Sequence, residues 1–384
     1  MSRAIAAGAG ILVGVLAGLV PGVHTNLIAL LALGLGVAGF DAAVFLVAVA
    51  VARSVTDAVP SVFLGASDAV MGVLPGHRLL KKGAGRDAVK CCVAGSVLGL
   101  VLGVVLIPVF IVVFPWVFAA LKPWLFWVLL AIVIFLVARE RSWFAVLVFG
   151  LSGFLGVVVL RSVADPLFPL LSGLFGASGL VLSLLEESEI PLQAGCDVVR
   201  LKPRALWCSV CLGVLAGSVV TLFPGLGPSQ AAALVRRKRT RATSALVMVG
   251  ALGTVDVVVS LVTFFVLGKA RNGAVIAIQS VLGSFSFSGL MYLVGVSCVA
   301  CGCAGVCALF ISGVFARVVE WANYQLVCVF VLVFLVVMSV VLCGWVGLLV
   351  LIVSTALGLV APEVGVSRAL AMGCVLVPTL LALA

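Results

Sequence analysis

The chain has 384 residues, of which 65% are hydrophobic and only 9% are charged, and its mean hydropathy is +1.43. No water-soluble domain carries so apolar a surface, so the composition predicts an all-α, polytopic membrane protein and excludes a large extramembrane catalytic domain. Lys and Arg outnumber Asp and Glu by 23 to 13. Basic cytoplasmic loops explain this excess without a nucleic-acid partner.

Apolar segments suited to helices follow one another along the whole chain. The first half holds them at 4–20, 23–39, 42–52, 61–74, 88–114, 115–138, 142–160 and 167–185. The second half holds them at 205–223, 229–235, 243–267, 273–296, 297–316, 325–343, 344–361 and 369–383. Several are shorter than the roughly 20 residues that a spanning helix needs, which favours discontinuous or re-entrant helices. The polar stretch 186–204 is the expected linker between membrane repeats at 1–185 and 205–384.

An internal repeat is visible when the chain is compared with itself. A shift of 203 residues superposes Pro21-Gly22 on Pro224-Gly225 and Leu64-Gly65 on Leu267-Gly268. The string GVLAG, however, occurs at 14–18 and 213–217, which is a different shift. The register before the Pro-Gly pair therefore stays open by about one helical turn.

Charge predicts that the two repeats cross the membrane in opposite directions. Five basic residues lie in 75–90 and five in 236–241, whereas the stretches that the shift pairs with them carry no charge. Loops that differ in this way in both directions are typical of an inverted-topology repeat that obeys the positive-inside rule. Free divergence of the loops after duplication is the alternative.

Each half contains an apolar helix that is interrupted by Pro-Gly and then restarts. Non-helical backbone at membrane depth is tolerated only beside protein or a water-filled cavity, and paired breaks indicate a transporter's binding site. Helix N-termini that open after such breaks favour an anion. The predicted substrate-binding residues are Pro21, Gly22, His24, Thr25, Asn26, Pro224, Gly225, Gly227, Pro228, Ser229 and Gln230. Simple kinks in spanning helices are the competing interpretation.

Charged residues inside apolar segments are costly and mark candidate functional sites. Arg53 and Asp57 are four residues apart, and the shift of 203 places Arg53 on Asp256. We therefore predict an Arg53–Asp256 pair, with Asp57 free to bind a proton or a sodium ion; a purely structural charge pair is the alternative. Ser61 and Lys269 are additional candidates for contact with an anion.

The cysteines do not predict a metal or redox centre. Four of them form the pattern C-x2-C-x-C-x3-C at Cys298, Cys301, Cys303 and Cys307. On one helix this spacing directs the thiols to different sides, whereas ligation needs them to converge. The P-loop, HExxH and GxSxG patterns of ATPases and hydrolases are also missing from the sequence, so we expect neither an enzyme nor a cofactor.

The sequence resembles a known family in several segments. LVPGVHTN, LFPGLGPSQ, VPSVFLGASDAVMGVLPGHRLLKKGAG, FPLLSGLFGASGLVLSL and GVSRALAMGCVLVPTLL are similar to the large membrane subunit of tripartite tricarboxylate transporters, especially its shorter archaeal relatives. The resemblance implies an inverted-repeat secondary transporter in which the Pro-Gly loops line an organic-anion site. It also implies a proton or sodium gradient as the driving force, a small membrane subunit and an extracytoplasmic binding protein.

The sequence thus predicts a multi-pass plasma-membrane transporter for a small organic anion, such as a di- or tricarboxylate, working by alternating access. The alternative is a translocase for a lipid-linked polyprenyl phosphate, which needs a similar anion site. An intramembrane redox enzyme built on the cysteines is a third hypothesis. The substrate, the coupling ion and a homodimeric assembly are left open.

Overall fold

The protein is helical throughout the part that the computed structural model describes. That part comprises residues 2–20, 23, 25–34, 38–64, 75–76, 78–162, 166–185, 202–223, 231–232, 234, 241–270, 272–321 and 324–384. It contains no strand, and nine of its helices are long and apolar enough to cross a membrane by length and composition. The prediction of an all-α polytopic membrane protein is therefore confirmed.

The first half contains both full-length and short helices. They are α1 (Arg3–Leu19), α2 (Thr25–Gly34), α3 (Gly39–Thr56), α4 (Ala58–Phe63), α6 (Gly85–Val105), α7 (Ile107–Leu121), the 3-10 turn η1 (Lys122–Trp124), α8 (Leu125–Arg139), α9 (Trp143–Ser162), α10 (Leu167–Leu171), the π-helix η2 (Ser172–Ala177) and α11 (Ser178–Leu185). Because α10, η2 and α11 are continuous, they form one apolar segment of 19 residues.

The described part of the second half has fewer helices, and three of them are longer than any in the first half. Its helices are α12 (Pro203–Val220), α14 (Ala242–Leu267), α15 (Gly273–Leu282), α16 (Phe287–Trp321), α17 (Tyr324–Glu363), the 3-10 helix η3 (Arg368–Met372) and α18 (Gly373–Leu383). At a shift of 203 residues, α3 and α4 together correspond to α14, α6 to the first part of α16, and α9 to the second part of α17.

Close glycine contacts of the same kind occur in the two halves. A Cβ at Gly10 in α1 would lie 2.5 Å from the Phe45 carbonyl oxygen and 2.8 Å from the Ala48 Cβ in α3. A Cβ at Gly213 in α12 would lie at the same distances from the Met248 oxygen and the Ala251 Cβ in α14. Every residue of the first contact moves onto its counterpart by 203. The contact of Gly14 with the Val49 oxygen (2.6 Å) and the Ala52 Cβ (2.8 Å) moves onto the same Gly213 contact by 199, the shift of the GVLAG string. Both registers therefore fit the packing, and the repeat stays a prediction.

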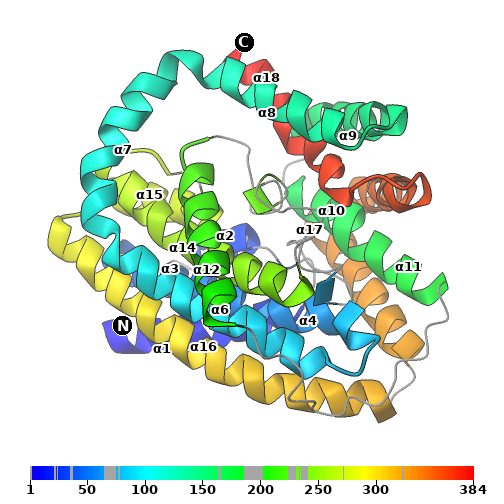
Figure 1. Cartoon of the computed structure of the whole chain (residues 1–384), viewed down its shortest axis with the longest axis horizontal. Coiled ribbons are helices and arrows are strands. Elements are labelled where there is room, and N and C mark those ends of the chain that lie inside the picture. Colours follow the sequence, from blue (N-terminus) through cyan, green and yellow to red (C-terminus); the bar gives the residue numbers. More distant parts are fainter. Residues whose placement is uncertain are drawn as a thin grey trace.

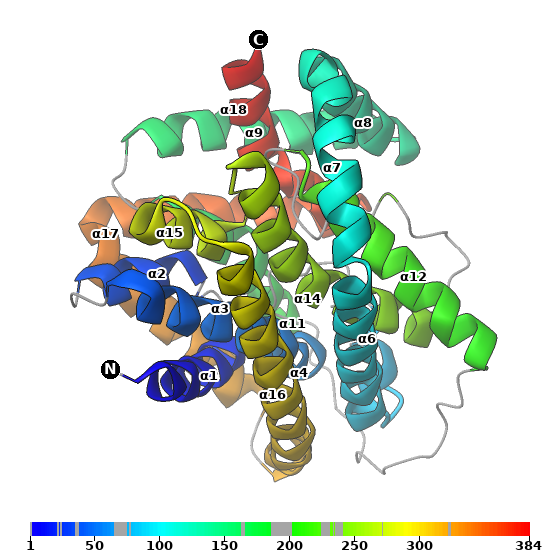
Figure 2. The same ribbon diagram turned by 90° about the vertical axis from the view of Figure 1, so that its left-hand side faces the viewer.

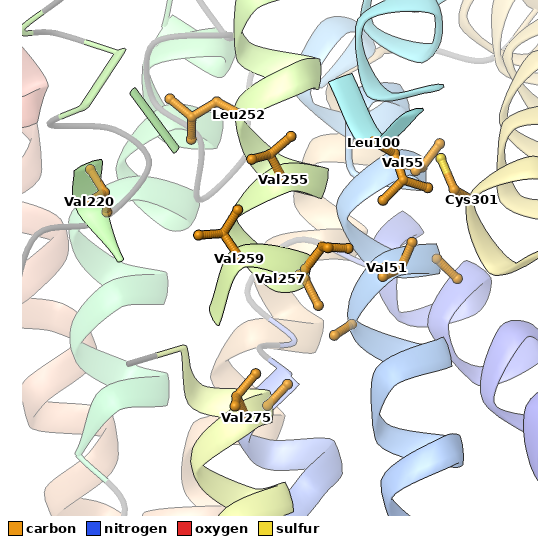
Figure 3. Packing of buried hydrophobic residues seen from close by; sticks show 14 of the residues in the cluster. Val51, Val55, Leu100, Val220, Leu252, Val255, Val257, Val259, Val275 and Cys301 are labelled. Carbon is orange, nitrogen blue, oxygen red and sulfur yellow. The ribbon is translucent and has the colours of Figure 1, made fainter. Parts of the chain in front are cut away.

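The two halves exchange helices across their boundary. Helix α6 of the first half packs most closely on α14 of the second, and α16 of the second half packs on α3 of the first. Gly95 and Gly99 of α6 allow this approach, since a Cβ at Gly95 would lie 2.1 Å from the Val247 carbonyl oxygen. Figure 3 shows the valines of α3 and α14, among them Val51 and Val257, filling the space between these helices.

The last helices of both halves form a second packed group. Helix α9 packs on η3 and α18, and η2 packs on α17, with separate apolar clusters between them. Helices α7 and α8 arch from the end of α6 to this group (Figure 1). From the side, α9 and α18 lie at one end of the molecule and α1 and α16 towards the other (Figure 2). The described part of the chain is thus built around one large apolar cluster and three smaller ones.

Several helix ends differ from the apolar segments of the sequence. The expected break between 114 and 115 is absent, because Pro115 lies inside α7, and the chain turns instead at Leu106 and at η1. The expected break between 296 and 297 is also wrong, since α16 runs unbroken through it. By contrast, the break expected at 344 is confirmed, because Gly344 is the point of non-helical backbone inside α17 (φ 62°, ψ −156°).

Candidate functional site

The two Pro-Gly breaks lie largely outside the described residues. This applies to Pro21, Gly22 and His24 in the first break, and to Pro224, Gly225, Gly227, Pro228, Ser229 and Gln230 in the second. Thr25 is the first residue of α2 and is buried, and Asn26 follows it in the first turn. The role predicted for these residues stays a prediction.

Arg53 links the first break to a spanning helix. It lies in the last turn of α3, half-buried, and its Nε donates a hydrogen bond of 2.7 Å to the carbonyl oxygen of Val23. Val23 comes directly after Pro21-Gly22. A guanidinium group is thus held at the backbone of Val23, beside the break.

Asp57 marks the point where α3 ends and α4 begins. Its N–H donates to the Arg53 carbonyl at 2.9 Å, and its own carbonyl accepts from the Ser61 N–H at 3.1 Å. The Asp57 side chain is half-buried, and Ser61 is buried within α4. Arg53, Asp57 and Ser61 therefore follow one another at successive turns of a single apolar segment.

Asp256 lies near the middle of α14, which has 26 residues. At about 1.5 Å per residue, its Cα is roughly 16 Å from the end of the helix at Leu267, which is about half of a bilayer's hydrocarbon thickness. Its side chain is only 9% exposed, and its Oδ2 accepts a hydrogen bond of 2.6 Å from the Asn272 amide nitrogen. A buried carboxylate at this depth is thus held by a residue that comes later in the chain.

Asn272 begins a re-entrant helix. Its Oδ1 caps the N-terminus of α15 by accepting from the Ala274 N–H at 3.0 Å. Further along α15, the Gln279 amide donates to the Gly268 carbonyl at 3.0 Å, and Gly268 ends α14. After α14 the chain therefore folds back until Asn272 lies beside Asp256, and α15 then runs alongside α14 towards Gly268. The re-entrant element expected near Lys269 is present, and α15 has only 10 residues.

Lys269 lies at the tip of this re-entrant segment. It is exposed, and its Nζ lies 5.2 Å from the centre of the Phe118 ring in α7. This is the geometry of a cation–π contact, which orients the ammonium group. Contact of Lys269 or Ser61 with an anion stays a prediction.

The helices that carry Arg53 and Asp256 approach each other closely. A Cβ at Gly253 in α14 would lie 3.9 Å from the Ser54 Cβ in α3. Arg53 precedes Ser54, and Asp256 comes one turn after Gly253. Arg53 donates one hydrogen bond to Val23, and Asp256 accepts one from Asn272. The direct Arg53–Asp256 pair stays a prediction.

Asn272 is a site residue that the sequence analysis missed. The signal was available, because an Asn directly before Gly273 and an apolar run is typical of a helix N-cap. The cysteines of α16 lie on different sides of the helix, as predicted: Cys301 is buried, whereas Cys298 and Cys303 are exposed.

Comparison with known proteins identifies the family. Residues 5–373 match the model of the tripartite tricarboxylate transporter TctA family. The chain belongs to this family. It is also 24% identical over 341 residues to the uncharacterized protein MJ1079 of Methanocaldococcus jannaschii, covering 85% of this chain and 84% of the relative. No solved structure matches the chain.

Membership of the TctA family establishes the coarse function. The protein is a multi-pass membrane component of a transporter, and the family provides the large subunit of a tripartite system. The family therefore supports the transport function predicted from the paired breaks, whereas it does not name the substrate.

Proposed function

We propose that this TctA-family protein is a secondary active transporter of a small organic anion, such as a di- or tricarboxylate. The observation that carries the proposal is the hydrogen bond from Arg53 to Val23, which holds a cation at the first Pro-Gly break. The re-entrant α15 begins beside Asp256 in the other half. Broken helices with charged groups at mid-depth are the usual construction of a transporter site.

In this proposal the anion binds between the two breaks. The neutral donors His24, Thr25, Asn26, Ser229 and Gln230 would hold its oxygens, and Arg53 would supply the compensating charge. Asp57 and Asp256 would take up the coupling ion, either a proton or sodium, because a carboxylate at membrane depth is more stable with a bound cation.

Alternating access follows from the repeat. Two halves inserted in opposite orientations adopt each other's arrangement when the site changes sides. We place the protein in the plasma membrane, together with a small membrane subunit and an extracytoplasmic binding protein, as the tripartite family suggests. A homodimer is compatible with this arrangement.

Ligand binding to purified protein tests the proposal. Thermal unfolding in detergent is recorded with citrate, other di- and tricarboxylates and a short-chain polyprenyl phosphate, each with and without sodium and at two pH values. We expect a soluble carboxylate to raise the unfolding temperature in a way that depends on sodium or pH. Stabilisation by the lipid phosphate alone would replace the proposal with a lipid-carrier translocase.

Two variants locate the site. Arg53→Gln should abolish the stabilisation by the carboxylate, whereas Arg317→Gln, a change at an exposed arginine of α16, should leave it intact. Equal stabilisation of both variants would show that the anion does not bind at Arg53.

A further inference from the structure

Arg368 is a second half-buried arginine, and it lies far along the chain from the Pro-Gly breaks. It opens η3, and its Nη2 donates to the Phe175 carbonyl at 3.0 Å and to the Ser178 hydroxyl. Both acceptors lie near the middle of the 19-residue apolar segment that α10, η2 and α11 form. A charged group is thus placed inside the helix bundle of the second packed group.

The guanidinium group has more donors than the protein satisfies. Its Nε is buried without a hydrogen-bond partner. Its Nη1 is not enclosed, and the hydrogen bonds that Arg368 makes in the described part of the chain all come from Nη2. No acidic side chain of the described residues forms an ion pair with it. An arginine in an apolar surrounding is expected to have a counter-ion, because an uncompensated buried charge is costly.

The surrounding structure holds this arginine in place. The π-helix η2 is buried along its whole length, and its wide turn leaves the Phe175 carbonyl available to Arg368. The Ser178 hydroxyl is fixed in turn, since it donates to the Leu174 carbonyl at 2.6 Å. Gly358 of α17 also packs against this turn, because a Cβ there would collide with the Leu174 oxygen. Helices packed this tightly leave the guanidinium group little freedom to turn.

We propose that Arg368 is a binding site for an oxyanion, a carboxylate or phosphate group that is recognised by the free edge of its guanidinium, with Ser178 as the residue that positions it. Two sources offer this chemistry, namely a soluble anion and the phosphate of an anionic lipid headgroup. The site does not depend on the proposed substrate site at the Pro-Gly breaks, because no residue is shared between them.

Binding assays with matched arginine variants test the site. The variants are Arg368→Met, Arg368→Lys and Arg161→Met, the last being an exposed arginine at the end of α9. The soluble probe is inorganic phosphate, titrated at constant ionic strength against purified protein. The lipid probe is phosphatidylglycerol in nanodiscs, compared with phosphatidylcholine alone.

The expected result is a loss that is specific to Arg368. The dissociation constant of either the soluble probe or phosphatidylglycerol should rise at least about tenfold in Arg368→Met, and less in Arg368→Lys, which keeps the charge but loses the planar fork. Arg161→Met should bind that probe as the wild type does. Equal binding by Arg368→Met and Arg161→Met would overturn the proposal and leave Arg368 as a structural cap of η2.

Imaging of the wild type decides the matter should Arg368→Met fail to fold. Cryo-electron microscopy in nanodiscs with phosphatidylglycerol and added phosphate should show density for an oxyanion at Nη1 of Arg368. A headgroup continuous with acyl chains would identify the lipid, and an isolated density the soluble ion. A bare Nη1 under these conditions would refute the site.

Discussion

Replacing Gly10 with leucine tests the close contact between α1 and α3, which has a counterpart between α12 and α14. A Cβ at this position lies 2.5 Å from the Phe45 carbonyl oxygen, whereas carbon and oxygen normally approach to about 3.3–3.6 Å. Helices α1 and α3 must therefore separate by about 1 Å, which forfeits a quarter to a half of the local dispersion energy. Overpacking of this kind costs about 1–3 kcal/mol, of which the better helix propensity of leucine returns less than about 1 kcal/mol.

Two matched variants accompany this measurement. Gly213→Leu should be as harmful as Gly10→Leu, because its contacts in α12 and α14 have the same distances. Gly8→Leu should be harmless, since nothing lies within 4 Å of a Cβ there and the residue is exposed on α1.

The assay is thermal unfolding in detergent. At about 2.1 cal/mol/K of unfolding entropy per residue, a net loss of about 2 kcal/mol should lower the unfolding temperature of this 384-residue chain by about 2–3 °C. Equal unfolding temperatures for Gly10→Leu and Gly8→Leu would refute the close approach of α1 and α3. A harmless Gly213→Leu beside a harmful Gly10→Leu would show that the α12–α14 contact is not equivalent to the α1–α3 contact.

Three further changes should lower stability in the same assay. Asn272→Leu removes the donor to Asp256 and the cap of α15, so we expect a loss of about 1.5–3 kcal/mol; an unchanged unfolding temperature would contradict that hydrogen bond. Thr254→Val removes the hydrogen bond of 2.9 Å to the Ser96 carbonyl, and a loss near 0.6 kcal/mol is typical in membranes, so a gain in stability would contradict it. Gly344→Ala places a side chain on backbone that favours glycine, at a cost of about 1–3 kcal/mol, and should not be neutral.

Composition and apolar runs predicted the helices well where polar residues bound them. The run at 243–267 corresponds to α14 at Ala242–Leu267, because RRKRTR precedes it and Gly268 ends it in the left-handed conformation. Prediction failed where an apolar run had no such boundary. Pro115 is accommodated inside α7, and the break expected between 296 and 297 is absent because α16 continues from Phe287 through that apolar stretch.

The candidate site was only partly predictable, for a different physical reason. The positions of Arg53, Asp57 and Asp256 stood out because charge is rare in apolar segments. Their partners depend on tertiary contacts: Arg53 reaches a backbone carbonyl 30 residues away, and Asp256 an asparagine of the next helix. The unsatisfied donors of Arg368 and the π-helix against which it lies are likewise absent from any local pattern.

In the predicted repeat, close glycine contacts recur in both halves whereas charged residues do not, and this difference matters for the proposed transport. Close backbone approaches recur at a shift of 203 residues, because tight glycine contacts tolerate no larger residue. The charged residues do not recur: Arg53 corresponds to Asp256, and Asp57 to Ser260, whose buried hydroxyl has no hydrogen-bond partner. A symmetric scaffold lets the two halves exchange arrangements at little cost. In the mechanism that we propose, Arg53 would compensate the charge of the anion and Asp57 and Asp256 would take up the coupling ion, so that the same motion would carry both.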